Sequence, residues 1–161
     1  MALAVAAADP PPQPASVEVI RDPITDHVRA YATVRARRNR LVVSCDSSDR
    51  DRPKVVFHSD RWLARGNLFS GFRPVTHRFD NQRPRRQMWH VEDRHATLTG
   101  ERRTAAFLAH LAASEKLVIR TRDLERNRID LTFPLIDVEA ALEQAMSACF
   151  GREWSVEDLR T

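Results

Sequence analysis

Glycine and lysine are scarce in this 161-residue sequence, which has four glycines and only two lysines, Lys54 and Lys116. A phosphate cradle built from backbone amides needs closely spaced glycines, and the sequence contains no GxGxxG turn or GxxxxGK[ST] loop. A GxSxG nucleophile elbow is also missing. No run approaches the roughly 18 apolar residues that a membrane-spanning helix requires. The sequence therefore gives no sign of a nucleotide-binding loop, a hydrolase elbow or a membrane span.

Cysteine is rare too, and the two that occur, Cys45 and Cys149, are far apart in the chain. Zinc sites use closely spaced pairs such as C-x-x-C, which neither residue offers. A nucleophilic cysteine is expected in an exposed position near a base. Cys45 instead continues the inward register of Leu41 and Val43, and Cys149 lies on the apolar stripe of an expected helix. In an exported protein this favours a Cys45–Cys149 disulfide that holds the last helix to the sheet; the alternative is two free buried thiols.

The histidines and carboxylates show no catalytic or metal-binding pattern. No HExxH motif or other tight metal spacing occurs, and the carboxylates are scattered beside arginines, as on a solvated surface. His77 and His90 alternate with apolar neighbours on expected strands, where lone histidines are usually structural. The histidines are His27, His58, His77, His90, His95 and His110. We therefore predict no catalytic residues, no metal and no cofactor.

The positive charge is carried almost entirely by arginine. The sequence has 26 basic and 22 acidic residues, a formal net charge of +4 and a pI near 9.8. Arginine binds carboxylates and phosphates in a bidentate geometry, and two segments, VRARRNR (34–40) and NQRPRRQMW (81–89), concentrate it. A coding bias that scatters arginine over the surface is the alternative. The candidate ligand-binding residues are Arg37, Arg38, Arg40, Arg83, Arg85, Arg86 and Trp89.

The N-terminal segment MALAVAAADPPPQP differs from the rest of the chain. A short alanine-rich run precedes Asp9 and a proline cluster, so that the segment resembles the end of a secretory signal peptide without its basic start. The alternative is an unstructured tail. We expect residues 1–16 to be a leader remnant and proline-rich linker, residues 17–151 to form one globular domain, and residues 152–161 to be a C-terminal tail.

From residue 17 onward, apolar and polar residues mostly alternate, the pattern of half-buried strands. The segment 61–73 holds two of the four glycines and is expected to be an irregular, aromatic-bearing loop. The expected strands cover residues 17–19, 28–35, 40–46, 54–59, 74–80, 86–91, 95–100, 116–123 and 127–135.

Two helices interrupt the strand pattern. Phe107, Leu108 and Leu111 recur at helical spacing within residues 102–116. A second helix is expected over residues 138–150, with Asp137 as its N-cap and Gly151 just past its end. The sequence therefore predicts an α+β fold: a mostly antiparallel sheet, curled or folded into a small sandwich, with two helices from the C-terminal half packed on it.

Arg78 and Asp80 are candidates for a structural ion pair. They share one face of the strand 74–80, opposite Phe79, and two residues along a strand separate them by about 6.6 Å. The alternative is a surface pair that contributes at most ~1 kcal/mol.

Several short motifs follow one another in a recognisable order along residues 17–150. Their residues are Leu41, Val43, Cys45, Arg78, Phe79, Asp80, Trp89, Phe107, Leu108, Leu111, Val118–Arg120, Thr132–Leu135, Ala141, Leu142, Ala148 and Cys149. This order resembles the VasI-like family of small exported bacterial proteins, which includes type VI secretion accessories and related envelope and phage modules. The resemblance implies an exported, disulfide-bearing, non-enzymatic module and supplies no catalytic residues.

Two classes of function therefore remain after sequence analysis. The first is a periplasmic or secreted accessory module that binds a protein or an anionic polymer. The second is an Arg-rich intracellular nucleic-acid-binding protein, in which basic turns contact phosphates and an exposed Trp89 stacks on a base. A cytoplasmic location follows if the N-terminus is not a leader remnant.

Overall fold

The computed structural model of the chain describes residues 10–49, 52–65 and 70–159. The predicted N-terminal leader lies mostly outside these residues. The elements are β1 (Ser16–Arg21), β2 (Val28–Ala36), β3 (Asn39–Asp46), β4 (Lys54–His58), β5 (Phe72–Phe79), β6 (Arg85–Glu92), β7 (His95–Leu98), α1 (Glu101–Ala113), β8 (Lys116–Arg122), β9 (Arg128–Pro134), α2 (Val138–Phe150) and the short 3-10 helix η1 (Val156–Leu159).

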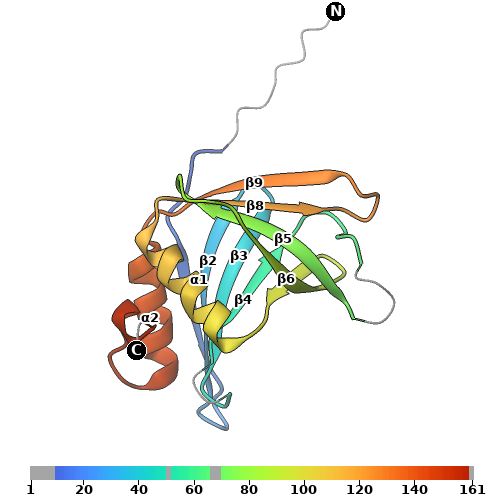
Figure 1. Cartoon of the computed structure of the whole chain (residues 1–161). Helices are drawn as coiled ribbons and strands as arrows, with labels where there is room; N and C mark the ends of the chain where they lie inside the picture. The colour runs from blue at the N-terminus through green and yellow to red at the C-terminus, as the bar shows by residue number, and fades with distance from the viewer. Residues whose placement is uncertain (1–9, 50–51, 66–69, 160–161) are drawn as a thin grey trace, which may run out of the picture.

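Within the described ranges, the strands form one nine-stranded antiparallel sheet in the order β1-β2-β3-β4-β7-β6-β5-β8-β9. The sheet curls, so that β8 and β9 lie across the upper ends of β2, β3 and β4 in Figure 1. Phe57 of β4 and Phe133 of β9 meet inside the curl in an edge-to-face contact, with ring centroids 6.2 Å apart. The α+β fold predicted from the sequence is confirmed, with a curled sheet in place of a sandwich.

Strict alternation explains how the strands build this core. Every second residue of β2, from Val28 through Val34, is buried, and the intervening residues are exposed or half-buried. Both helices stand together on one side of the sheet (Figure 1), and Phe107 of α1 contacts the inward side chains of β5 and β6. Arginines that alternate with these apolar residues along a strand are thereby directed to the outer surface.

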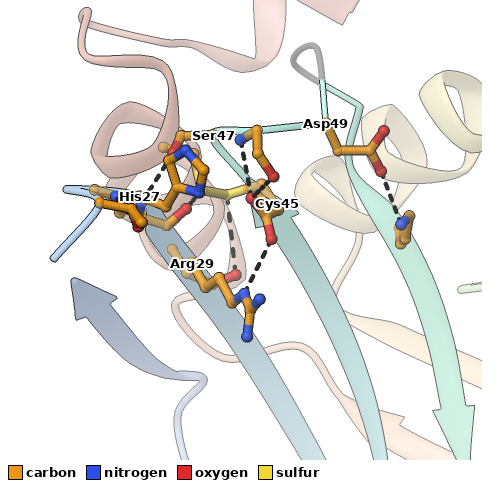
Figure 2. Close-up of polar contacts among 12 residues, drawn as sticks. His27, Arg29, Cys45, Ser47 and Asp49 are labelled. Carbon is orange, nitrogen blue, oxygen red and sulfur yellow. Dashed lines mark hydrogen bonds and ion pairs between the residues drawn. A yellow bond between two sulfur atoms is a disulfide. The ribbon is translucent and has the colours of Figure 1, made fainter. Parts of the chain in front are cut away.

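The predicted disulfide is confirmed. Cys45 at the end of β3 and Cys149 on α2 are joined with an S–S distance of 2.04 Å, and both are buried. Figure 2 shows this bond beside Arg29, whose Nε donates to the Asp46 carboxylate at 3.0 Å. Hydrogen bonds from Ser48 are the main cause that lowers the pKa of Asp46 to about 2. The disulfide between Cys45 and Cys149 holds α2 against the sheet, in agreement with the predicted inward registers of the two cysteines.

The predicted N-terminal linker and the predicted C-terminal tail both contact the domain where the structure describes them. The backbone N–H of Ala15 donates to the carbonyl of Ile136 at 2.8 Å, just after β9. At the other end, Trp154 and Val156 are buried in the core at 5% exposure each. The segment after Gly151, which we predicted to be a C-terminal tail, therefore contributes Trp154 and Val156 to the core.

The sequence predicted capping residues at both ends of α2, and the structure confirms the one at the C-terminal end. Gly151 adopts the left-handed conformation just past the helix, and its N–H donates to the carbonyl of Ser147. Asp137 precedes the helix but is itself left-handed, with φ 55°, and its side chain makes no capping hydrogen bond. An N-cap side chain reaches the first free amides from an extended backbone, so the predicted capping role of Asp137 is wrong.

Candidate anion-binding surface

The first predicted arginine group lies around the two-residue turn between β2 and β3. Arg37 takes the left-handed conformation that this tight turn requires, with φ 55°, and Arg38 is exposed beside it. Arg40 lies on β3, directly opposite His58 of β4. The pKa of His58 is lowered to about 4, first by burial and then by the positive charges of His95 and Arg40.

The second predicted group lies at the turn from β5 to β6. Arg83 is in the turn, and Arg85 and Arg86 are the first two residues of β6, so they point to opposite faces of the sheet. Arg86 is on the outer face, opposite Thr76 of β5. Arg85 pairs with the buried His77, and its charge is one of the causes that lower the pKa of His77.

The structure places further arginines between these two groups. Thr76 of β5 pairs with Arg120 of β8, and Arg120 pairs in turn with Asp130 of β9. This cross-strand row therefore runs from Arg86 on β6, across β5 and β8, to Asp130 on β9. Arg78 shares the outer face of β5 with Thr76, and Arg122 of β8 pairs with Arg128 of β9. The exposed residues Arg78, Arg86, Arg120, Arg122 and Arg128 are called here the arginine face.

The arginine face has an excess of positive charge. Asp130 is the only carboxylate in the cross-strand pairs of these five arginines. It accepts hydrogen bonds from Arg120 at 2.6 and 3.0 Å. Arg128 approaches the same carboxylate, with Nε 3.2 Å from Oδ2. Hydrogen bonding to Arg120 holds the pKa of Asp130 below its usual value, so this pair stays ionised at neutral pH. Four guanidinium groups therefore remain in excess of the acidic charge.

Two exposed basic side chains on β2 and β4 are instead paired with carboxylates. Arg29 pairs with Asp46 at 3.0 Å, and Lys54 pairs with Asp49 at 2.8 Å, as Figure 2 shows. Arg29 and Lys54 thus have acidic partners, whereas the cross-strand partners of Arg78 and Arg86 are Val118 and Thr76.

Two clefts border the arginine face where β9 approaches β2. One, of about 410 Å³, contains Arg35, Arg37 and Thr132. The other, of about 610 Å³, contains Arg37 and Arg38 together with Arg128. Arg37 and Arg38 of the first predicted group thus share a cleft with Arg128 of the arginine face. The second predicted group includes Arg86, which is itself part of that face. The two groups border one surface from opposite sides and do not form a single cluster.

Trp89 does not belong to this surface. It faces inward on β6 with 0% exposure, and its ring lies 5.6 Å from that of Phe107 in an edge-to-face contact. The predicted ligand-stacking role of Trp89 is therefore wrong, because the strand register that exposes Arg86 turns Trp89 into the core. The exposed tryptophan is Trp62, with 47% exposure.

Arg78 and Asp80 do not pair with each other in the part of the chain that the structure describes. Asp80 follows the last residue of β5 in a left-handed conformation, with φ 46°, so it leaves the strand face that holds Arg78. Its Oδ1 accepts the backbone N–H groups of Glu115 and Lys116 at 3.0 and 2.9 Å. The carboxylate thus fixes the start of β8, and the predicted ion pair is wrong.

Among the described residues, no three metal-ligating side chains gather into a potential metal site. His58 and His95 are neighbours on β4 and β7, with ring centroids 4.5 Å apart. His77 lies between Phe79 and Phe107, and its Nδ1 has no hydrogen-bond partner in this structure. Burial is the main cause that lowers the pKa of His77 to about 4, so its ring is neutral at neutral pH.

Sequence reasoning missed Arg120, Arg122 and Arg128. The search for basic residues used dense runs, whereas these arginines alternate with apolar residues along KLVIRTR and its partner strand. Alternation with a buried set is itself the signal, since the arginines that alternate with buried residues along a strand lie on its outer face.

Comparison with protein-family models, with curated proteins and with solved structures finds no match for this chain. The resemblance to the VasI-like family therefore stays a prediction. None of the helices in the described ranges has the length and apolar character needed to span a membrane.

Proposed function

We propose that this protein is a non-enzymatic, exported binding module of the bacterial cell envelope, and that its arginine face binds an anionic polymer. A role as a type VI secretion accessory is the narrower form of this proposal and rests on the family resemblance alone. The observation that carries the proposal is the register of four neighbouring strands, which directs five arginines outward and pairs them across the strands with one carboxylate, that of Asp130.

The chemistry of this face suits a chain of regularly spaced anions. Guanidinium groups bind carboxylates, sulfates and phosphates through paired N–H donors, and they stay charged at every physiological pH. Arg78 and Arg86 have no carboxylate facing them in their cross-strand pairs, Val118 and Thr76. A ligand that replaces water at these side chains gains charge-assisted hydrogen bonds without breaking an internal ion pair.

The disulfide supports the exported part of the proposal. Structural disulfides form and persist in oxidising compartments such as the periplasm and are rare in the cytosol. The Cys45–Cys149 bond is buried in the domain and links two elements 104 residues apart. A bond of this kind is compatible with folding outside the cytoplasm.

Nucleic-acid binding remains the alternative, and one of its supports is lost. It combined basic turns with an exposed Trp89 for base stacking, whereas Trp89 is in the core. The arginine face alone does not distinguish a nucleic acid from another polyanion, so the choice between them is an outcome of the experiment.

The test is binding to heparin and to single-stranded DNA over a range of salt concentrations. The double variant Arg78→Gln/Arg86→Gln removes two arginines from the face. Its matched control, Arg102→Gln/Arg103→Gln, removes two exposed arginines from α1 and changes the net charge equally. We expect the first variant to bind heparin more weakly and to lower the salt slope by about one for each lost contact. The control should bind as the wild type does.

Two results would contradict the proposal. Equal loss of binding in both double variants would mean that net charge, and not the arginine face, drives the interaction. DNA-selective binding that survives about 0.2 M salt would favour the nucleic-acid alternative, because purely electrostatic binding weakens steeply over that range.

A further inference from the structure

Trp62 is the exposed tryptophan in a protein that buries its other two. Its exposure is 47%, compared with 0% for Trp89 and 5% for Trp154. Leu124, which is 55% exposed, lies beside it, and the backbone N–H of Leu124 donates to the carbonyl of Trp62 at 2.8 Å. Exposed tryptophans with apolar neighbours are enriched at binding sites, because the indole ring offers a large, rigid contact area.

Two turns that are distant from Trp62 in the sequence hold its backbone in place. Ser59 and Leu63 donate their N–H groups to the carbonyls of Arg94 and Asp93, both at 2.8 Å, in the turn between β6 and β7. Leu63 also forms a β-bridge with Asp123 in the turn between β8 and β9. The backbone around Trp62 is therefore fixed on both sides. This lowers the entropic cost of ordering the site when a ligand binds.

A cleft of about 380 Å³ opens beside the Trp62 ring, and polar side chains line it. Arg61, Glu125 and Asn127 supply both hydrogen-bond donors and acceptors at its walls. Arg94 lies over the indole ring, with its guanidinium carbon 5.3 Å from the ring centroid. We call Arg61, Trp62, Arg94, Leu124, Glu125 and Asn127 the Trp62 platform.

A buried carboxylate organises this platform. Asp123 is 7% exposed, and its Oδ1 accepts the backbone N–H of Asn127 at 2.8 Å. Its Oδ2 lies 3.2 Å from the Asn127 side-chain nitrogen and 3.6 Å from Nη1 of Arg61. Asn127 also donates to Glu125 at 3.3 Å. These bonds fix the positions of the polar groups before any ligand arrives.

We propose that the Trp62 platform binds one sugar residue of an acidic glycan, and this inference rests on the proposed function. The weakly positive C–H face of a pyranose ring packs on the electron-rich indole face of Trp62. The sugar hydroxyls pair with Asn127 and Glu125, and Arg61 pairs with a carboxylate of the glycan. Arg61 also lines the larger cleft that holds Arg37, Arg38 and Arg128, so the glycan chain continues from the platform toward the arginine face.

The mixed charge of the platform favours a glycan over a nucleic acid. A phosphodiester backbone offers Glu125 only hydrogen-bond acceptors and negative charge, whereas each unit of an acidic glycan also offers hydroxyl donors that the Glu125 carboxylate accepts. A hydroxyl group both donates and accepts, so it satisfies a carboxylate, an amide and a guanidinium at once. The acids beside Trp62 are therefore compatible with sugar binding and unfavourable for a phosphate chain.

The test uses oligogalacturonate, polyphosphate and oligothymidylate of matched charge as probes, with tryptophan fluorescence and calorimetry as readouts. In the wild type, oligogalacturonate should change the fluorescence of Trp62. Trp62→Ala should weaken oligogalacturonate binding at least tenfold, with less than a twofold effect on polyphosphate, and Trp62→Phe should restore most of the affinity. Ile24→Ala, at a side chain that is 91% exposed on the turn between β1 and β2, is the control and should have no effect.

The outcomes separate this inference from the proposed function. Polyphosphate binding without oligogalacturonate binding would overturn the glycan site and leave the arginine face intact. Oligogalacturonate binding that is unchanged in Trp62→Ala would also overturn the glycan site at Trp62 and leave the arginine face intact. Equal weakening of oligogalacturonate and oligothymidylate by Trp62→Ala would identify a general stacking surface and also overturn the glycan assignment. If the wild type binds none of the three polyanions, both proposals fail.

Discussion

Arg120 on β8 holds Asp130 on β9 through two hydrogen bonds, from Nε to Oδ1 at 2.6 Å and from Nη2 to Oδ2 at 3.0 Å. The pair is exposed, and Arg128 approaches the same carboxylate from its other side. Asp130 therefore occupies two arginines that would otherwise be available to a ligand, and it limits the charge of the arginine face.

Replacing this carboxylate should strengthen polyanion binding. Asp130→Asn removes one negative charge and releases Arg120 and Arg128, so we expect a roughly fivefold higher affinity for heparin at low salt, as for one unit charge at about 4 Å in water. The gain should decrease as salt screens the charges. Glu18→Gln on β1 makes the same charge change outside the arginine face and should raise the affinity much less. An unchanged affinity in Asp130→Asn would show that the ligand does not contact this face.

The disulfide should contribute strongly to stability. Replacing both cysteines, Cys45→Ala with Cys149→Ala, should lower the free energy of unfolding by about 2–4 kcal/mol, with ~4.7 kcal/mol as the upper value for a loop of this length. Urea unfolding with and without a reducing agent measures the effect. The reductant should destabilise the wild type and leave the double variant unchanged. Two alkylatable thiols in non-reduced, air-exposed protein would contradict the presence of the bond.

Stability should fall in mild acid because of His77. Burial, together with the charges of Arg85 and His110, lowers its pKa in the folded state from 6.5 to about 4. Between these two values the unfolded chain binds a proton that the folded protein does not, so the free energy of unfolding decreases as the pH falls. The decrease is on the order of 3 kcal/mol across this window.

Unfolding measured between pH 7 and pH 4 tests this dependence. His77→Phe should make the dependence shallower, since phenylalanine fits among Phe79 and Phe107 and does not titrate. The lowered pKa of His58 should account for acid dependence that remains in this variant. His27→Gln, at an exposed histidine, should keep the dependence of the wild type. Parallel curves for the wild type and His77→Phe would exclude His77 as the cause.

Asp80 should matter more than Arg78 for stability. Asp80→Ala removes the acceptor for two backbone N–H groups at the start of β8, and loss of charged hydrogen bonds of this kind costs about 1–3 kcal/mol. Asp80→Asn keeps an acceptor oxygen and should cost less. Arg78→Ala removes an exposed side chain and should shift the chemical denaturation midpoint very little. Equal shifts for Arg78→Ala and Asp80→Ala would instead indicate that the two residues act together.

The C-terminal segment should be part of the folding unit. Trp154→Ala leaves a cavity in the core and should lower the free energy of unfolding by about 3–5 kcal/mol. Trp62→Ala is the matched control, since the same substitution at an exposed site should change stability by about 0.5 kcal/mol or less. If Trp154→Ala were as stable as Trp62→Ala, the segment after Gly151 would not belong to the core.

The fold could be predicted because its signals are local. Alternation in residues 28–34 identifies a half-buried strand, and the 3.6-residue period of Phe107, Leu108 and Leu111 identifies a helix. Each of these inferences uses only the side-chain period of one element. The Cys45–Cys149 bond needed more, because the inward registers of a strand and a helix favour it only for an exported protein and leave two buried thiols as the alternative.

The candidate site could be predicted only in part, because it depends on strand order. Arg86 and Arg120 share a row only because β5 lies between β6 and β8, and no local pattern contains that information. Trp89 was assigned to the surface by its basic neighbours, although its position three residues after Arg86 gives it the opposite face. The proximity of Trp62 to Leu124 likewise depends on contacts between loops that are about sixty residues apart.

The path of Pro10–Gln13 has a practical consequence for experiments on this protein. These residues line the cleft formed by Arg35 and Arg37, and Pro10 also lines the cleft that contains Arg128. A purification tag, fluorophore or surface tether attached directly to Pro10 would therefore begin at the edge of both clefts and compete with a ligand for the same space. The C-terminal end of the described chain lies beside α2, away from β8 and β9 (Figure 1), so immobilisation through that end leaves the arginine face turned toward the solution.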